Sequence, residues 1–233
     1  MHDFLTGTAY TLLYYIILAS SALILRFLIK IPDEIFRKTL HCILLGSLLV
    51  YVFGFEYWHT SVLSCVIFAA VVFPILWFFE RFRAYSAAVT ERSKGELKIS
   101  LLVVFSMFAV VITVCRGLLG DSMLVLATVY AWGFGDAAAA LIGKKYGKHK
   151  IRGGKKSWEG SAAMFAVSFA SVFVILMFRS GMPVYGYVIT SAVTALVCSV
   201  VEYLTPGGFD TITCPFAAMT VLIPFTALFG GIV

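Results

Sequence analysis

Residues 121–160 read DSMLVLATVYAWGFGDAAAALIGKKYGKHKIRGGKKSWEG, and this stretch decides the fold. Its first part, over 121–143, is an apolar run that contains one interior carboxylate, Asp136. A helix of about 20 apolar residues crosses the hydrocarbon core of a bilayer and satisfies its own backbone hydrogen bonds there. The second part, over 144–156, is dense in lysine and glycine. The stretch therefore predicts a membrane-spanning helix that ends in a basic loop.

The rest of the chain has the same apolar character. Of its 233 residues, 61% are hydrophobic and 13% are charged, and the mean hydropathy of +0.98 is far above that of soluble proteins. We predict an all-α fold: a polytopic membrane bundle of about eight (seven or eight) helices that forms one integral-membrane domain over 1–233. Pro215 and Pro224 lie in the last span and can kink it. The expected spans are 9–29, 39–55, 60–79, 99–116, 121–143, 159–178, 184–204 and 213–232.

The basic residues predict the topology of this bundle. Loops 30–38, 80–98 and 144–156 hold three, five and seven of the 18 Lys and Arg residues, and they all fall on one side of the predicted membrane. Because positive loops stay in the cytoplasm, we expect 80–98 and 144–157 to be cytoplasmic loops and both termini to be external. Topology and anionic lipid headgroups account for the net charge of +6, so we expect no nucleic-acid partner.

Asp136 is the first candidate for chemistry. On a helix it shares a face with Trp132, Ala140 and Gly143, and small residues surround it. Such a carboxylate can hydrogen-bond across a helix interface, which is a packing role. An ionisable residue inside a span is nevertheless costly and favours a function. We therefore predict that Asp136 binds a divalent cation, Mg²⁺ or Mn²⁺, close to the basic loop.

The basic loop is the second candidate. Its glycines can turn backbone N–H groups toward an anion, and its lysines add positive charge. It is not a Walker A loop, because His149 and Lys156 stand where that motif needs Gly and Ser or Thr. We expect Ser157 to cap the next helix, and Glu159 either to bind the metal or to pair with a lysine. The predicted nucleotide-binding residues are Gly143, Lys144, Lys145, Gly147, Lys148, Gly153, Gly154, Lys155, Lys156, Ser157 and Gly160.

A third group precedes the second span. Glu34, Arg37, Lys38 and His41 have helical spacing that places all four on one face. This pattern fits a polar site at the membrane surface. It also fits an interfacial helix start in which long side chains extend toward water, with Pro32 in the first turn.

These motifs together resemble the CTP-binding signature of the polyprenol kinase family. The run Asp136-x-x-Ala-x-x-x-Gly143-x-x-x-Gly147, followed by Lys-Lys-Ser157-x-Glu-Gly160, carries the resemblance. That family comprises dolichol kinase, phytol kinase and the CTP-dependent diacylglycerol kinase of fungi, and it is related to the CDP-diacylglycerol synthases. The resemblance implies a cytosolic loop that binds a nucleoside triphosphate, usually CTP, with a divalent metal.

Two shorter stretches are similar to the family as well. The group from Glu34 to His41 matches its early E-x-x-R-K-x-x-H element, and Lys-Gly-Glu96-Leu matches an element before the fourth span. The family often has an Asp-Asn pair before Thr-x-Pro, whereas this chain has Asp210 followed by Thr211. The resemblance implies a metal or base role for Asp210, and the missing Asn changes the geometry expected there.

We therefore predict a CTP-dependent lipid-alcohol kinase that transfers the γ-phosphoryl group to a long-chain lipid alcohol at the cytoplasmic membrane face. The acceptor is a polyprenol, phytol, farnesol or diacylglycerol. The predicted catalytic residues are Asp136, Lys156, Glu159 and His41. The predicted metal ligands are Asp136, Glu159 and Asp210. The predicted lipid-headgroup residues are Glu34, Arg37, Lys38, His41 and Glu96.

Two other functions stay open at this point. A phosphatidate cytidylyltransferase-like enzyme would use the same nucleotide but attach CMP to a lipid phosphate. A small membrane transporter would have its site near the middle of the bilayer. In each case the chain is a multi-pass membrane protein, in the plasma membrane if prokaryotic and in the endoplasmic reticulum if eukaryotic.

Overall fold

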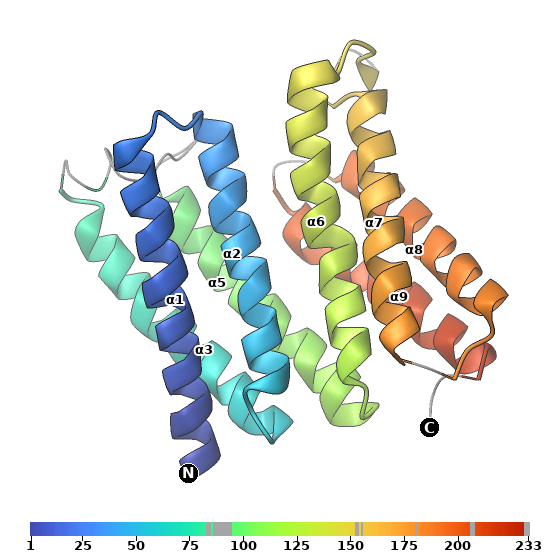
Figure 1. Ribbon diagram of the computed structural model, residues 1–233, viewed down its shortest axis with the longest axis horizontal. Helices are drawn as coiled ribbons and strands as arrows, with labels where there is room; N and C mark the ends of the chain where they lie inside the picture. Colours follow the sequence, from blue (N-terminus) through green and yellow to red (C-terminus); the bar gives the residue numbers. More distant parts are fainter. Residues whose placement is uncertain are drawn as a thin grey trace. The chain divides into compact units, whose positions relative to one another are not determined.

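The computed structural model describes residues 1–82, 85, 95–151, 154, 156–179, 181–205 and 208–230, and these residues are almost entirely helical (Figure 1). Eight of their helical segments are long and apolar enough to cross a membrane. The prediction of an all-α polytopic bundle is confirmed. The chain divides into two compact units, Met1–Gly117 and Leu118–Val233. A single integral-membrane domain over 1–233 stays a prediction.

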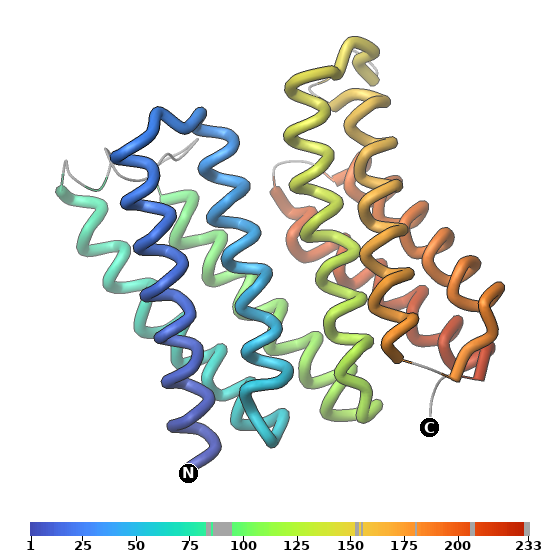
Figure 2. Tube along the Cα trace, in the orientation of Figure 1, coloured from blue at the N-terminus to red at the C-terminus, as the bar shows by residue number. Residues whose placement is uncertain are grey.

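The first unit consists of four apolar segments that run back and forth (Figure 2). They are α1 (His2–Leu28), α2 (Asp33–Phe53), α3 (Trp58–Phe79) and α5 (Glu96–Val111), which continues into the π-helix η1 (Ile112–Leu118). Tyr51, Phe105 and Phe108 are buried at its centre, and the Tyr51 ring makes edge contacts with the rings of Phe105 and Phe108, at 6.1 and 6.3 Å between centroids. Aromatic packing therefore joins α2 to α5.

A polar contact closes a turn at each end of this unit. At one end the turn between α2 and α3 is closed by Arg116, which donates to the carbonyl oxygens of Phe55 (2.7 Å) and Glu56 (3.0 Å). At the other end Arg26 pairs with Asp33 across the turn between α1 and α2 at 3.1 Å. Both ends are polar, and the helical walls between them are apolar.

The second unit consists of α6 (Ser122–Tyr146), α7 (Trp158–Arg179), α8 (Val184–Leu204) and α9 (Asp210–Leu228). Helix α6 packs against the other three and is the most buried of the eight spans. Small residues let α7 approach it closely: a Cβ added at Gly160 would lie 3.0 Å from the carbonyl oxygen of Ala139. The contact between α6 and α7 fixes where the basic loop leaves the helices.

Helices α1, α2, α5 and α9 begin three to seven residues before the predicted spans do, at His2, Asp33, Glu96 and Asp210 rather than at 9, 39, 99 and 213. The starts of α2 and α9 have a clear physical reason. Helix α2 begins at Asp33 rather than at 39, because Pro32 suits the start of a helix and two acidic residues in the first turn favour its positive end. Helix α9 runs over Asp210–Leu228 rather than 213–232, and it contains Pro215 and Pro224 without ending at either. In both cases the charged first turn, which the hydropathy pattern left outside the span, is helical.

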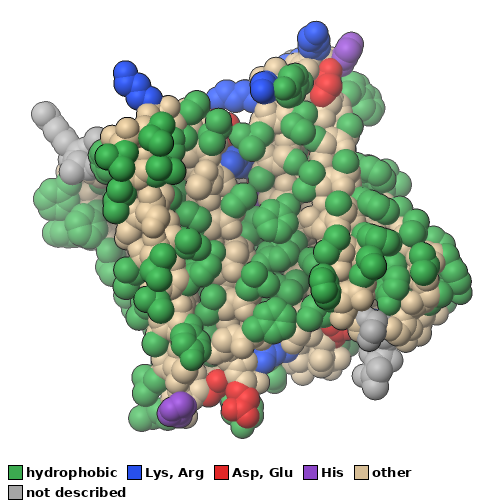
Figure 3. Space-filling model, in the orientation of Figure 1, with side chains coloured by type: hydrophobic (Ala, Val, Ile, Leu, Met, Phe, Trp, Pro, Cys, Tyr) green, Lys and Arg blue, Asp and Glu red, His purple; other side chains and the backbone are tan. Residues whose placement is uncertain are grey.

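Exposed apolar side chains cover the helical walls. Figure 3 shows hydrophobic side chains along the helices and charged side chains near the helix ends on the face that it draws. Ile16, Val66 and Val174 are each at least half exposed in the middle of their helices. Water would not favour such walls, whereas hydrocarbon would.

The close contact between α6 and α7 leads to the first prediction. In Gly160→Val the new side chain would meet Ala139, and overpacking of this kind costs about 1–3 kcal/mol. We expect a lower melting temperature for the purified protein in detergent. The matched control is Ala162→Val, an exposed position on the same helix turn that should melt close to the unchanged protein. An equal effect of both substitutions would contradict the packing role of Gly160.

Candidate active site

In the basic loop between α6 and α7, residues 149–151 pair with residues 156–158, and we call this paired segment the hairpin. Lys150 and Ser157 form an antiparallel bridge, Ile151 N–H donates to the carbonyl of Lys156 at 3.0 Å, and Trp158 N–H donates to that of His149 at 3.0 Å. Ser157 is 3% exposed, and its Oγ accepts the Gly160 N–H at 3.2 Å. The expectation that Ser157 caps the following helix is therefore confirmed.

Glu159 closes the base of this hairpin. Its carboxylate accepts the backbone N–H groups of Lys148 and His149, each at 3.2 Å, and it lies 2.7 Å from His149 Nδ1. The side chain thus faces the loop. It uses most of its acceptor capacity to hold residues 148–149 against the start of α7.

The glycines of the loop have packing and turn roles in this structure. The N–H of Gly147 donates to the Gly143 carbonyl at 3.1 Å, that of Gly154 to the Ile151 carbonyl at 2.9 Å, and that of Gly160 to Ser157. These amides are already engaged within the protein. The prediction that the loop binds a nucleotide therefore depends on its side chains more than on its backbone.

The lysines around the hairpin are open to solvent. Lys144, Lys145 and Lys148 are exposed, and Lys145 lies over the ring of Tyr146 with its Nζ 5.0 Å from the centroid. Because these three side chains are exposed, an anion can approach them from the solvent. Of the other predicted nucleotide-binding residues, Gly153 and Lys155 lie outside the described residues.

Lys156 connects the hairpin to the end of α8. Its Nζ lies 2.9 Å from Glu202 Oε1, and it donates to the carbonyl oxygens of Glu202 and, at 3.1 Å, of Thr205. A cation at this place complements the negative C-terminal end of a helix. The pair is partly buried, with 34% of the Lys156 side chain and 12% of the Glu202 side chain exposed. The loop and the C-terminus of α8 are therefore held at the same end of the unit.

Three carboxylates from three helices gather near this contact. Glu202 of α8 interacts electrostatically with both Asp136 of α6 and Asp210 of α9. The indole Nε1 of the buried Trp132 donates to Asp210 Oδ2 at 3.3 Å, which holds the first turn of α9 against α6. The structure thus brings together Asp136, Asp210 and Lys156, which are far apart in the sequence.

The predicted metal ligands do not all converge. Among the described residues, no three His, Cys, Asp or Glu side chains are grouped closely enough to hold a metal ion. Glu159 faces the hairpin, whereas Asp136 and Asp210 flank Glu202. Mg²⁺ in phosphoryl-transfer sites commonly uses one or two carboxylates together with substrate phosphates and water. Asp136 and Asp210 offer hard oxygen donors of this kind, so the residues present fit the ion.

Glu202 is absent from the sequence-based assignment of the site. The sequence does contain a signal for it, because Glu202 is the only carboxylate of an otherwise apolar helix and lies in its last turn, beside the membrane surface. The pairing with Lys156 spans 46 positions of the chain and could not be read from spacing.

The polar group of α2 forms a second cluster, in the first unit. Arg37 lies 3.3 Å from Glu34 on its own helix and 3.9 Å from Glu96 at the start of α5. Lys38 is only 8% exposed, and His41 is partly buried one turn further along α2. The structure therefore joins the two short motifs, around Glu34 and around Glu96, into one charged cluster.

Two proteins of named function are similar to the chain. It is 35% identical over 92 residues to a phytol kinase of Synechocystis sp., which is 39% of this chain and 38% of that protein. It is 31% identical over 157 residues to a probable chloroplastic phytol kinase of Triticum aestivum, which is 62% of this chain and 49% of that protein. The matched part thus spans less than half of either relative. No protein-family model matches the chain, and no solved structure matches it.

The role of Glu159 leads to the second prediction. Glu159→Ala removes the charged acceptor for two loop amides, which then lose the hydrogen bonds that protect them from exchange. We expect the amides of Lys148 and His149 to exchange with deuterium about tenfold faster or more. Glu56→Ala, in a turn of the first unit, is the control and should leave this exchange unchanged. Unchanged exchange in Glu159→Ala would rule out the closing role of this carboxylate.

Proposed function

We propose, on the premise that the chain belongs to the polyprenol and phytol kinase family, that it is a lipid-alcohol kinase that transfers the γ-phosphoryl group of CTP to a long-chain alcohol. The observation that carries the proposal is the contact of Lys156 with Glu202, next to Asp136 and Asp210, at the end of a bundle of apolar helices. A basic loop and a group of carboxylates at a membrane surface are what a triphosphate and its metal require.

The phosphates of the donor would bind to the lysines of the hairpin. Lys144, Lys145 and Lys148 are exposed at the end of α6 and can approach an anion from the solvent. Lys156 is held in place by Glu202 and by two carbonyl groups, so its position is fixed before any ligand arrives. Phosphoryl transfer depends mainly on positioning and on charge stabilisation, and a fixed ammonium group supplies both.

Asp136 and Asp210 would hold the divalent ion, Mg²⁺ or Mn²⁺. When bound, the ion would neutralise charge on the phosphate oxygens. Trp132 fixes the orientation of the Asp210 carboxylate through its indole N–H. Glu202 places a third negative charge close by, and its pairing with Lys156 offsets part of the repulsion among the carboxylates. Glu159 would hold the loop in its conformation, because its oxygens are engaged by loop residues.

The acceptor would be a lipid alcohol, and phytol is the first to test because both relatives are named phytol kinases. Its chain would lie along the exposed apolar walls of the helices, and its hydroxyl would reach the polar end of the bundle. The charged cluster of Arg37, Glu34 and Glu96, with Lys38 and His41, would contact the headgroup region. The reaction would take place at the cytoplasmic face, with both termini external.

One experiment separates this proposal from its alternatives. Purified protein in detergent is mixed with Mg²⁺, with CTP labelled at the γ- or the α-phosphate, and with phytol, farnesol, a polyprenol, diacylglycerol or phosphatidate. Transfer of the γ-label alone into the lipid establishes a kinase and identifies its acceptor. Transfer of the α-label to phosphatidate establishes a cytidylyltransferase. The absence of both, with ATP and UTP also tested, overturns the nucleotide-dependent function and favours transport.

Asp136 gives the third prediction. Asp136→Asn keeps the size of the side chain but removes the charge that would bind the cation, so we expect kcat to fall at least about 100-fold. The melting temperature should stay close to that of the unchanged protein, which the assay in detergent can check. The control is Asp33→Asn, a 68% exposed carboxylate at the start of α2, which should retain activity. Unchanged turnover in Asp136→Asn would remove this residue from the mechanism.

A further inference from the structure

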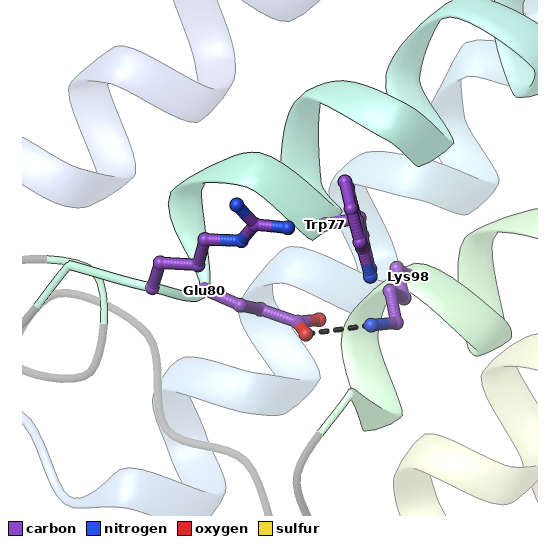
Figure 4. A pocket seen from close by; sticks show the side chains of 4 residues that line it. Trp77, Glu80 and Lys98 are labelled. Atoms are coloured by element: carbon purple, nitrogen blue, oxygen red, sulfur yellow. Dashed lines mark hydrogen bonds and ion pairs between the residues drawn. The ribbon is translucent and has the colours of Figure 1, made fainter.

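A pocket in the first unit is lined by residues to which the sequence analysis assigned no role. It is lined by Trp77, Glu80, Arg81 and Lys98, where α3 ends and α5 begins (Figure 4). Its volume of about 310 Å³ is at the small end for ligand sites, which suits a headgroup rather than a whole lipid. Gly95, in the left-handed region at φ +82°, precedes α5, and a Cβ there would lie 3.0 Å from Lys98 Cε. The absence of a side chain at Gly95 therefore makes room for the Lys98 side chain.

Glu80 is the decisive group of this pocket. Its Oε2 accepts from Lys98 Nζ at 2.6 Å, and Figure 4 shows the two side chains pointing toward one another with Trp77 beside them. The Glu80 side chain is only 6% exposed. Its second oxygen, Oε1, is buried and has no hydrogen-bond partner among the described residues. A buried acceptor of this kind carries a large desolvation cost, so the pocket requires a hydrogen-bond donor.

The charges around Glu80 decide which donor fits. Lys98 is paired with Glu80, and the guanidinium of Arg81 lies over the Trp77 ring at 4.2 Å from its centroid. An ammonium headgroup would add a third cation beside Lys98 and Arg81. A phosphate headgroup would place its negative oxygens against Glu80 Oε1. A neutral hydroxyl donates the missing hydrogen bond and meets neither repulsion.

The rim of the pocket indicates what carries the hydroxyl. Ile75, Trp77, Phe78 and Phe79 are 46–50% exposed on the last turns of α3, where a bilayer would contact them. Tryptophan is enriched at the membrane–water boundary, so Trp77 marks the depth at which a headgroup lies. A polar group bound to Glu80 would therefore extend into an apolar chain along α3.

We propose that this pocket binds the hydroxyl group of a long-chain lipid alcohol, which donates its hydrogen bond to Glu80 Oε1. Lys98 holds the carboxylate in place, and Trp77 contacts the first carbons of the chain. Identifying this alcohol with the phosphoryl acceptor rests on the proposed kinase function. The binding of a neutral hydroxyl does not, and other hydroxyl lipids such as diacylglycerol share the same chemistry.

The first test changes the ligand and leaves the protein intact. Binding of labelled phytol and of its methyl ether is measured with purified protein in detergent; the ether has the same chain but cannot donate a hydrogen bond. We expect phytol to bind about tenfold more tightly or more, as a hydrogen bond to a charged group provides. Diacylglycerol, an alkylamine and an alkyl phosphate compete in parallel. Equal affinity for the alcohol and the ether, or stronger competition by the amine or the phosphate, would overturn the proposal.

The second test locates the site. A photoreactive phytol analogue with a diazirine near its hydroxyl should crosslink to peptides that contain Trp77 or Lys98. Glu80→Gln should weaken phytol binding about tenfold but leave ether binding unchanged, with Asp33→Asn as the control. Crosslinks elsewhere, or equal losses for both ligands, would overturn the proposal. If Glu80→Gln does not fold, the ligand comparison and the crosslinks in the unchanged protein decide.

The two proposals fail in different ways. Transfer of the γ-label to phytol, with the alcohol crosslinked outside this pocket, would leave the kinase function standing and remove the pocket. Hydroxyl-dependent binding at Glu80, without label transfer from any nucleotide, would leave the pocket standing and remove the kinase function.

Discussion

The ion pair of Lys156 with Glu202 connects the parts of the second unit on which any chemistry there depends. A bilayer excludes unpaired charges from the spans, so polar groups must gather where helices end. Lys156 meets that condition, because it pairs with Glu202 and donates hydrogen bonds to two carbonyl groups at the end of α8. Without this contact the hairpin would not be attached to the helix that carries Glu202. The charge of Glu202 would then add to that of Asp136 and Asp210.

Small residues on α6 and α7 make this arrangement possible. Because Gly160 brings α7 within contact of Ala139 and Gly143, the start of α7 lies directly against the end of α6. The close packing of α6 and α7 is therefore a sufficient reason for these glycines. In the proposed function their contribution to anion binding would be indirect: they bring two helix ends together, and the side chains of the loop would provide the charge.

Patterns with a local cause could be read from the sequence, whereas long-range pairings could not. Hydropathy predicted the helices, and the spacing of Ser157 before α7 predicted its cap. The starts of α2 and α9 were placed too late, because the acidic first turns of these helices lower the hydropathy without breaking the helix. Glu202 and Glu80 were not identified, since their roles come from Lys156 and Lys98, which reach them only after folding. Glu159 pairs with loop amides, which a sequence does not display.

The contrast between Glu159 and Glu80 shows how, under the proposed function, one chain would bind two unlike substrates. A lipid kinase must bind a highly anionic nucleotide and a neutral alcohol. Glu159 has its oxygens occupied by loop amides and His149, so its negative charge is partly offset by the donors that surround it. Glu80 has one oxygen paired with Lys98 and the other without a donor among the described residues, which favours a neutral hydroxyl over either ion. If both proposals hold, the hydrogen-bonding state of these two carboxylates, more than the net charge of the protein, would determine which headgroup each unit accepts.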